Sequence, residues 1–114
     1  MTLRHRLLVA EVCEALLELH LSEETPATKA DILKEMEDRG TKPEVRRVFQ
    51  SKRPTMAEFN TAFRFTETFG LVRPERTSSG KYVYSLEGRL KEVMNACRGD
   101  FDDVITDFAK KPWK

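Results

Sequence analysis

Histidine and cysteine are the side chains of this sequence best suited to bind a metal, and there are two of each. His5 and His20 are isolated, because neither has a cysteine or carboxylate nearby at the spacing of a metal site. Cys13 and His20 are seven residues apart on one expected helix, a spacing more typical of packing than of a ligand pair. Cys97 lies far from Cys13 in sequence. We therefore expect no metal site and two reduced, buried thiols. A disulfide between Cys13 and Cys97 is the alternative, although nothing in the sequence requires it.

A group of acidic residues near the C-terminal end, Asp100, Asp102 and Asp103, is the other candidate for chemistry. Acidic side chains stabilise the start of a helix, whereas a calcium loop needs ligands at alternate positions, a glycine and a final glutamate. The sequence contains no glycine-rich phosphate loop and no nucleophile elbow. We predict that the protein is not an enzyme and requires no cofactor.

Charge is unevenly distributed along the chain, although the formal net charge is only +1. Residues 1–41 carry five basic and nine acidic side chains, whereas residues 42–81 carry nine basic and four acidic side chains. A basic middle third is typical of a protein with one phosphate-facing surface. An ordinary solvated face is the alternative interpretation.

The length of 114 residues and the composition, 39% hydrophobic and 34% charged, predict a single globular domain. The basic start and the apolar residues after it resemble a secretory signal, but Glu11, Glu14 and Glu18 interrupt that stretch at helical spacing. No apolar run approaches the roughly 20 residues of a membrane span. We expect a cytoplasmic protein without a membrane segment.

Two helices are expected in the first third. The first covers residues 3–21, and its main apolar stripe consists of Leu3, Leu7, Ala10, Cys13, Leu16 and Leu17. Val9, Val12 and Leu19 add apolar surface beside that stripe, so the helix is either central to the core or shared with a second subunit. Thr28 predicts the start of a second helix, in which Ile32, Leu33 and Met36 face inward.

Two further helices are expected in the middle of the chain. Pro43 can open a short helix over residues 44–51. A capping box of Thr55 and Glu58 then begins a helix that Gly70 ends. Its expected inward stripe is Met56, Phe59, Ala62, Phe63, Thr66 and Phe69. Phe65 lies off this stripe, and either packs under segment 41–54 or is an exposed anchor for a protein partner.

The pattern then changes to a hairpin, with strands at 71–76 and 81–86 around a turn at 77–80. Pro74 predicts an edge in the first strand, and Tyr82, Tyr84 and Leu86 share one face of the second, with Val83 on the other. A last helical region begins near residue 87, with an apolar stripe of Leu90, Val93, Met94 and Cys97. Asp100 can cap a final short helix, and residues 111–114 form a loose tail.

This element order, with the Phe69-Gly70-Leu71-Val72 junction and the exit Tyr82-Val83-Tyr84-Ser85-Leu86-Glu87-Gly88-Arg89, resembles the winged helix-turn-helix domains of bacterial and archaeal regulators. The resemblance covers about residues 3–97. It implies a mainly helical fold with a small β-hairpin wing, forming one domain over residues 1–110 with a helical extension from about residue 87. It also implies double-stranded DNA as the partner and transcriptional regulation as the function.

The resemblance implies that helix 55–69 enters the major groove and that the wing meets the DNA backbone. The expected base-reading residues are Asn60, Thr61, Arg64 and Thr68. The expected phosphate contacts are Arg46, Arg47, Lys52, Arg53, Arg73, Arg76 and Lys81. The sequence departs from the family between residues 41 and 54, since a helix-turn-helix connection is normally about 3–4 residues long. Helix 44–51 could therefore take the recognition position instead.

Two expectations concern protein partners. The first and last helices carry more apolar surface than a small domain needs, which predicts a homodimer that reads a palindromic site. The main alternative to DNA binding is a winged-helix adaptor or inhibitor, for example from a phage or plasmid, that docks on a larger complex. The near-neutral net charge, the acidic first third and Phe65 favour that alternative.

Overall fold

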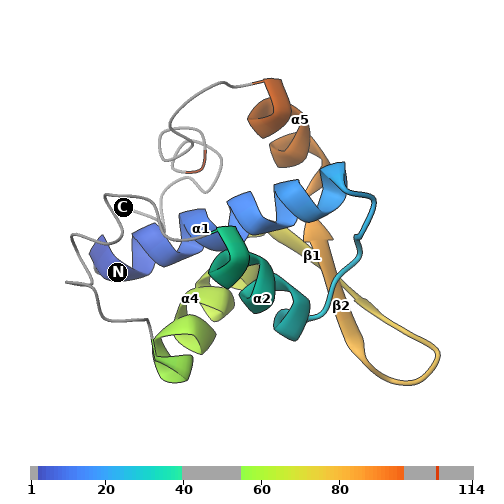
Figure 1. The fold of residues 1–114 in the computed structure, drawn as a ribbon, viewed down its shortest axis with the longest axis horizontal. Coiled ribbons are helices and arrows are strands. Elements are labelled where there is room, and N and C mark those ends of the chain that lie inside the picture. The colour runs from blue at the N-terminus through green and yellow to red at the C-terminus, as the bar shows by residue number, and fades with distance from the viewer. Residues whose placement is uncertain (1–2, 40–54, 97–104, 106–114) are drawn as a thin grey trace.

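The structure is a computed structural model that describes residues 3–39, 55–96 and 105. The order of the described elements is α1 (Leu3–Leu21), α2 (Lys29–Arg39), α4 (Met56–Thr68), β1 (Val72–Arg76), β2 (Tyr82–Leu86) and α5 (Gly88–Ala96). Helix α1 lies at the centre and contacts α2, α4, β2 and α5 (Figure 1). The described part of the chain is therefore mainly helical with an antiparallel hairpin, as predicted. None of the described helices is long and apolar enough to span a bilayer.

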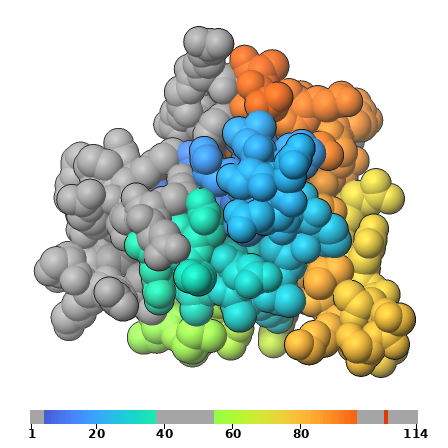
Figure 2. Space-filling model, turned by 45° about the vertical axis from the view of Figure 1, so that its right-hand side comes forward, coloured from blue at the N-terminus to red at the C-terminus, as the bar shows by residue number. Residues whose placement is uncertain are grey.

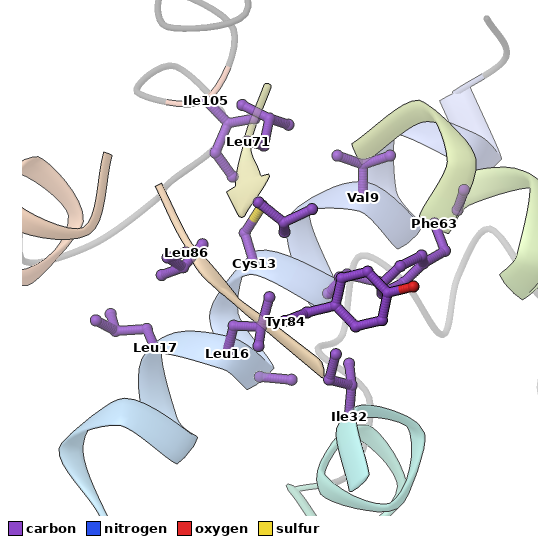
Figure 3. Close-up of a cluster of buried hydrophobic side chains, with 14 of the residues drawn as sticks. Val9, Cys13, Leu16, Leu17, Ile32, Phe63, Leu71, Tyr84, Leu86 and Ile105 are labelled. Atoms are coloured by element: carbon purple, nitrogen blue, oxygen red, sulfur yellow. The ribbon is translucent and has the colours of Figure 1, made fainter. Parts of the chain in front are cut away.

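Helix α1 is buried on nearly every side, which one apolar stripe does not explain. Val9 and Val12, expected beside the stripe, are fully buried, as are Leu8 and Ala15. The reason is the central position of α1, which packs against helices and the hairpin on different sides (Figure 3). Apart from Leu21, which is 54% exposed in the last turn, most of the apolar surface of α1 is thus used within one chain.

Helix α2 begins where Thr28 caps it. The Asp31 amide donates to the Thr28 hydroxyl at 3.1 Å, and the Thr28 amide donates to the Asp31 carboxylate at 3.2 Å. Ile32 is fully buried, and Leu33 and Met36 pack against the core while remaining partly exposed. The predicted cap and inward face are therefore confirmed.

Helix α4 also starts and ends as the sequence predicts. Thr55 and Glu58 form the reciprocal capping box, and Gly70, at φ +69°, follows the last turn in a conformation that glycine adopts without strain. Phe59, Ala62, Phe63 and Thr66 are buried. Met56 was expected on this face, but it is 56% exposed. The error has a geometric cause, because Met56 lies in the first turn and to one side of the buried direction.

The hairpin has the predicted strands within one residue, with Val72 opposite Leu86 and Arg76 opposite Tyr82. Sequence reasoning did not find a bridge between Ala27 and Tyr84, which exchange two main-chain hydrogen bonds of 2.9 and 2.7 Å. The main-chain amide and carbonyl of Tyr84 both point to Ala27, so the pair of Tyr84 and Pro74 has no main-chain hydrogen bonds. The nitrogen of Pro74 therefore faces the outer edge, as the missing amide proton requires.

Helix α5 starts at the carboxylate of Glu87, which accepts from the amides of Arg89 and Leu90. Leu90 and Met94 are buried, but Val93, expected beside them, is 49% exposed. Leu90 and Met94 are four residues apart, and Val93 lies to one side of the line between them, so the buried face is narrower than predicted. Cys97 and the expected short helix after Asp100 lie outside the described residues.

Candidate nucleic-acid interface

Helix α4 has one face in the core and the opposite face open. Phe59 and Phe63 hold it against the rest of the protein, while Asn60 and Arg64 are exposed. Residues four apart on a helix lie one above the other, so the amide and the guanidinium form a single polar surface. The Arg64 side chain is exposed, as a guanidinium that contacts a ligand must be.

The two threonines expected beside them are less suited to reading bases. The hydroxyl of Thr61 donates to the carbonyl of Ala57 at 2.9 Å, and the hydroxyl of Thr68 donates to the carbonyl of Arg64 at 2.9 Å. Both side chains are exposed, but their single proton is already used by the helix backbone. They can accept a hydrogen bond, whereas Asn60 and Arg64 can donate.

The three basic residues of the hairpin do not share one face. Side chains alternate along a strand, so Arg76 lies on the face that carries Pro74, and Arg73 lies on the opposite face with Glu75. Because Tyr84 pairs with Pro74 and contacts helix α4, Arg76 is on the helix side. From the sequence, Arg73 and Arg76 were both expected to contact phosphate from the same surface. The pairing register places them on opposite faces of the hairpin. Lys81 is exposed at the end of the turn.

The turn of the hairpin is held by its own hydrogen bonds. The Thr77 amide donates to the Lys81 carbonyl at 2.8 Å, and the Lys81 amide donates to the Thr77 hydroxyl at 3.1 Å. The hydroxyls of Thr77 and Ser79 are 2.9 Å apart. Gly80 adopts φ +87°, which other residues rarely adopt. The turn therefore presents Arg76 and Lys81 from a fixed backbone.

An acidic residue lies where α4 meets the hairpin. Burial raises the pKa of the Tyr84 phenol above its usual value, and the negative charge of Glu67 raises it further, followed by Tyr82. Glu67 on α4 is thus close enough to act on a side chain of β2. Negative charge at this junction weakens the attraction of the surface for phosphate.

The charge of the described surface is nearly balanced. Residues 55–81 carry four basic side chains, Arg64, Arg73, Arg76 and Lys81, and three acidic ones, Glu58, Glu67 and Glu75. Most of the predicted basic excess therefore belongs to residues 42–54. The expected phosphate contacts Arg46, Arg47, Lys52 and Arg53 lie outside the described residues, as does the possible helix 44–51.

Phe65, which was expected to lie off the inward stripe of its helix, is partly buried against the core. Its ring stacks on Phe69 at 5.9 Å between centroids and meets the ring of His5 on α1 at 5.6 Å. Phe65 therefore helps to join α4 to α1. Its predicted packing under segment 41–54 lies outside the described residues.

Cys13 is a free thiol and fully buried, and burial raises its pKa, with the charge of Glu14 raising it further. In the described ranges no three histidine, cysteine or acidic side chains gather in a way that could hold a metal ion. Glu11 and Glu14 are only 3% exposed, although the sequence suggested no burial for either.

Figure 2 shows one side of the molecule, on which helix α2 lies beside α4 and the hairpin forms the right-hand edge. The tip of the hairpin projects beyond the helices (Figure 1).

Comparison of the chain with known protein families, with curated proteins and with solved structures found no match. The functional interpretation therefore rests on the geometry of α4 and the hairpin.

Proposed function

We propose that this chain is a winged-helix protein that binds double-stranded DNA sequence-specifically and regulates transcription. The observation that supports the proposal best is the pair Asn60 and Arg64 on the open face of α4, a helix fixed in the core by its other face. An amide pairs bidentately with adenine, and a guanidinium pairs bidentately with guanine, in a groove wide enough for a helix. A rigid helix holds both groups in register.

The hairpin supports the same proposal. It follows α4 after Gly70, Leu71 is fully buried, and Tyr84 contacts Phe63, so its base is attached to the helix that would read the groove. Arg76 and Lys81, at its outer end, are suited to phosphate contacts beside that groove. Phosphate contacts set the register of a protein on DNA, and base contacts select the sequence.

The proposal is tested by selecting bound duplexes from a randomised pool and then measuring affinity for the selected site. We expect a defined sequence, with Arg64→Ala losing about 1–3 kcal/mol of binding free energy and relaxing the preference at one guanine. Asn60→Ala has the same kind of effect at an adenine. Arg89→Ala is the matched control, because this exposed arginine is on α5, away from α4 (Figure 1). Failure of the pool to converge argues against sequence-specific binding.

A protein-binding adaptor is the second candidate. It is favoured by the near balance of charge over residues 55–81 and by the exposure of Met56 on the open side of α4. Apolar exposed residues of this kind are enriched at protein interfaces. If the chain binds no duplex even at low salt, capture of a protein partner that Met56→Glu abolishes supports this function instead.

The homodimer is a separate proposal. Most of α1 is buried inside the domain, so the exposed apolar side chains of these two helices that support it are Leu21 at the end of α1 and Val93 on α5. Light scattering at tens of micromolar tests it, and a monomer at that concentration contradicts it.

A further inference from the structure

Tyr82 is the aromatic side chain on the outer part of the hairpin. It lies on the same face of β2 as Tyr84 and Leu86, yet it is 55% exposed while Tyr84 is 6% exposed. The difference arises because Tyr84 lies against Phe63 of α4, whereas Tyr82 is one pair nearer the turn, beyond that contact. A large ring at this position adds little to the core of the domain.

Arg76 accompanies this ring. Arg76 lies directly opposite Tyr82 across the hairpin. The pair of Pro74 and Tyr84 has no main-chain hydrogen bonds, and the pair of Arg76 and Tyr82, two residues away, is therefore also of the non-hydrogen-bonded kind. Side chains approach most closely in such pairs, and the guanidinium carbon is 5.7 Å from the centre of the ring. This distance permits a cation–π contact, so arginine and ring form one unit.

The setting of this unit is positively charged and preorganised. Lys81 precedes Tyr82, and the turn between the strands is closed by hydrogen bonds of Thr77 and by the positive φ of Gly80. A flat aromatic surface with Arg76 against it, preceded in the chain by the exposed Lys81, suits a planar ligand attached to an anion. A nucleotide with an unpaired base has this chemistry, since its base offers a π-face and its sugar carries a phosphate.

We propose that Tyr82 stacks on unpaired nucleobases while Arg76 and Lys81 contact the adjoining phosphates, so that the hairpin binds single-stranded or frayed DNA. This inference rests on the proposed DNA-binding function, and it adds a second kind of substrate at the hairpin. Duplex recognition by α4 uses Asn60 and Arg64 and does not require the Tyr82 ring.

The test measures fluorescence anisotropy with three labelled probes: oligodeoxythymidine of about 15 nucleotides, an abasic oligomer of equal length, and a blunt random duplex. We expect oligodeoxythymidine to bind about tenfold more tightly than the abasic oligomer, because both carry the same phosphates and only one carries bases. Tyr82→Val removes the π-face but keeps a good strand former, and should abolish that tenfold difference. Tyr82→Phe should retain it.

The outcomes separate this inference from the proposed function. Equal binding of the two single-stranded probes by the wild type, or an unchanged preference in Tyr82→Val, overturns the stacking proposal while leaving duplex binding intact. Loss of blunt-duplex binding by more than about threefold in Tyr82→Val also overturns it, since the ring would then serve the duplex. Absence of duplex binding by the wild type, with base-dependent binding of single strands retained, overturns the proposed function alone. Thermal unfolding of both variants verifies that the hairpin is retained.

Discussion

The rings of Phe63 and Tyr84 meet edge to face, with centroids 4.6 Å apart and an interplanar angle of 80° (Figure 3). This contact joins helix α4 to strand β2. On α2, the Lys29 ammonium lies 4.8 Å from the centre of the Phe63 ring, so three elements meet at this ring. The position of the hairpin relative to the open face of α4 depends on this packing.

We expect Phe63→Ala to lower the free energy of unfolding by about 3–5 kcal/mol, because it removes a fully buried ring from between these elements. Urea denaturation followed by circular dichroism measures the change. Phe65→Ala is the matched control on the same helix, and its loss should be smaller because that ring is only partly buried. Equal losses for the two variants would contradict the central role of Phe63.

Helix α4 depends on its capping box for the order of its first turn. Removal of the Thr55 hydroxyl leaves the amide of Glu58 without the acceptor that lies 3.1 Å away. Thr55→Ala should therefore cost about 1 kcal/mol in urea denaturation. Thr61→Ala, at an exposed position within the helix, should change the free energy of unfolding by less than about 0.5 kcal/mol. A neutral Thr55→Ala would show that the cap does not contribute.

The register of the hairpin is tested by moving proline one residue. Pro74 points its nitrogen to the outer edge, so Pro74→Val should be tolerated, with a change in the free energy of unfolding below about 1 kcal/mol. Glu75 pairs with Val83. Because hydrogen-bonded and non-hydrogen-bonded pairs alternate along an antiparallel ladder, the pair of Glu75 and Val83 is hydrogen-bonded and the pair of Pro74 and Tyr84 is not. Glu75→Pro removes a ladder donor and should cost about 3 kcal/mol. The reverse order of the two effects would show that the register is shifted by one residue.

The buried thiol of Cys13 makes stability fall in alkaline solution. Burial raises its pKa above the ordinary 9.0 in the folded state, so above that pH the unfolded chain releases a proton that the folded chain retains. The free energy of unfolding should decrease by up to about 1.4 kcal/mol per pH unit from this one group. Urea denaturation across this range should give a shallower decrease for Cys13→Ala than for the wild type. Parallel pH profiles would contradict the shift.

Much of the fold could be predicted because its signals are local. The capping box at Thr55, the end of α4 at Gly70 and the strands around the turn each depend on a few adjacent residues. The bridge between Ala27 and Tyr84 could not be predicted, because its two residues are far apart in sequence. The residues around Ala27 also show no strand pattern. The all-round burial of α1 also depends on which elements surround it.

The candidate site was predicted in part. Asn60 and Arg64 could be predicted, since helical spacing alone brings them together on the open face. The separation of Arg73 from Arg76 follows from strand alternation and could have been derived from the sequence. The effect of Glu67 on Tyr84 required the packing of α4 on the hairpin.

The most direct test of DNA binding is the affinity for a random duplex, measured by fluorescence anisotropy from low to physiological salt. We expect micromolar binding that weakens steeply with salt. The slope of log affinity against log salt should become less steep by about two when Arg76 and Lys81 are both changed to glutamine. Arg89→Gln, on α5, should leave the slope unchanged. Absence of duplex binding at low salt would contradict DNA binding, and a slope that the Arg76 and Lys81 changes do not alter would contradict phosphate contacts by the hairpin.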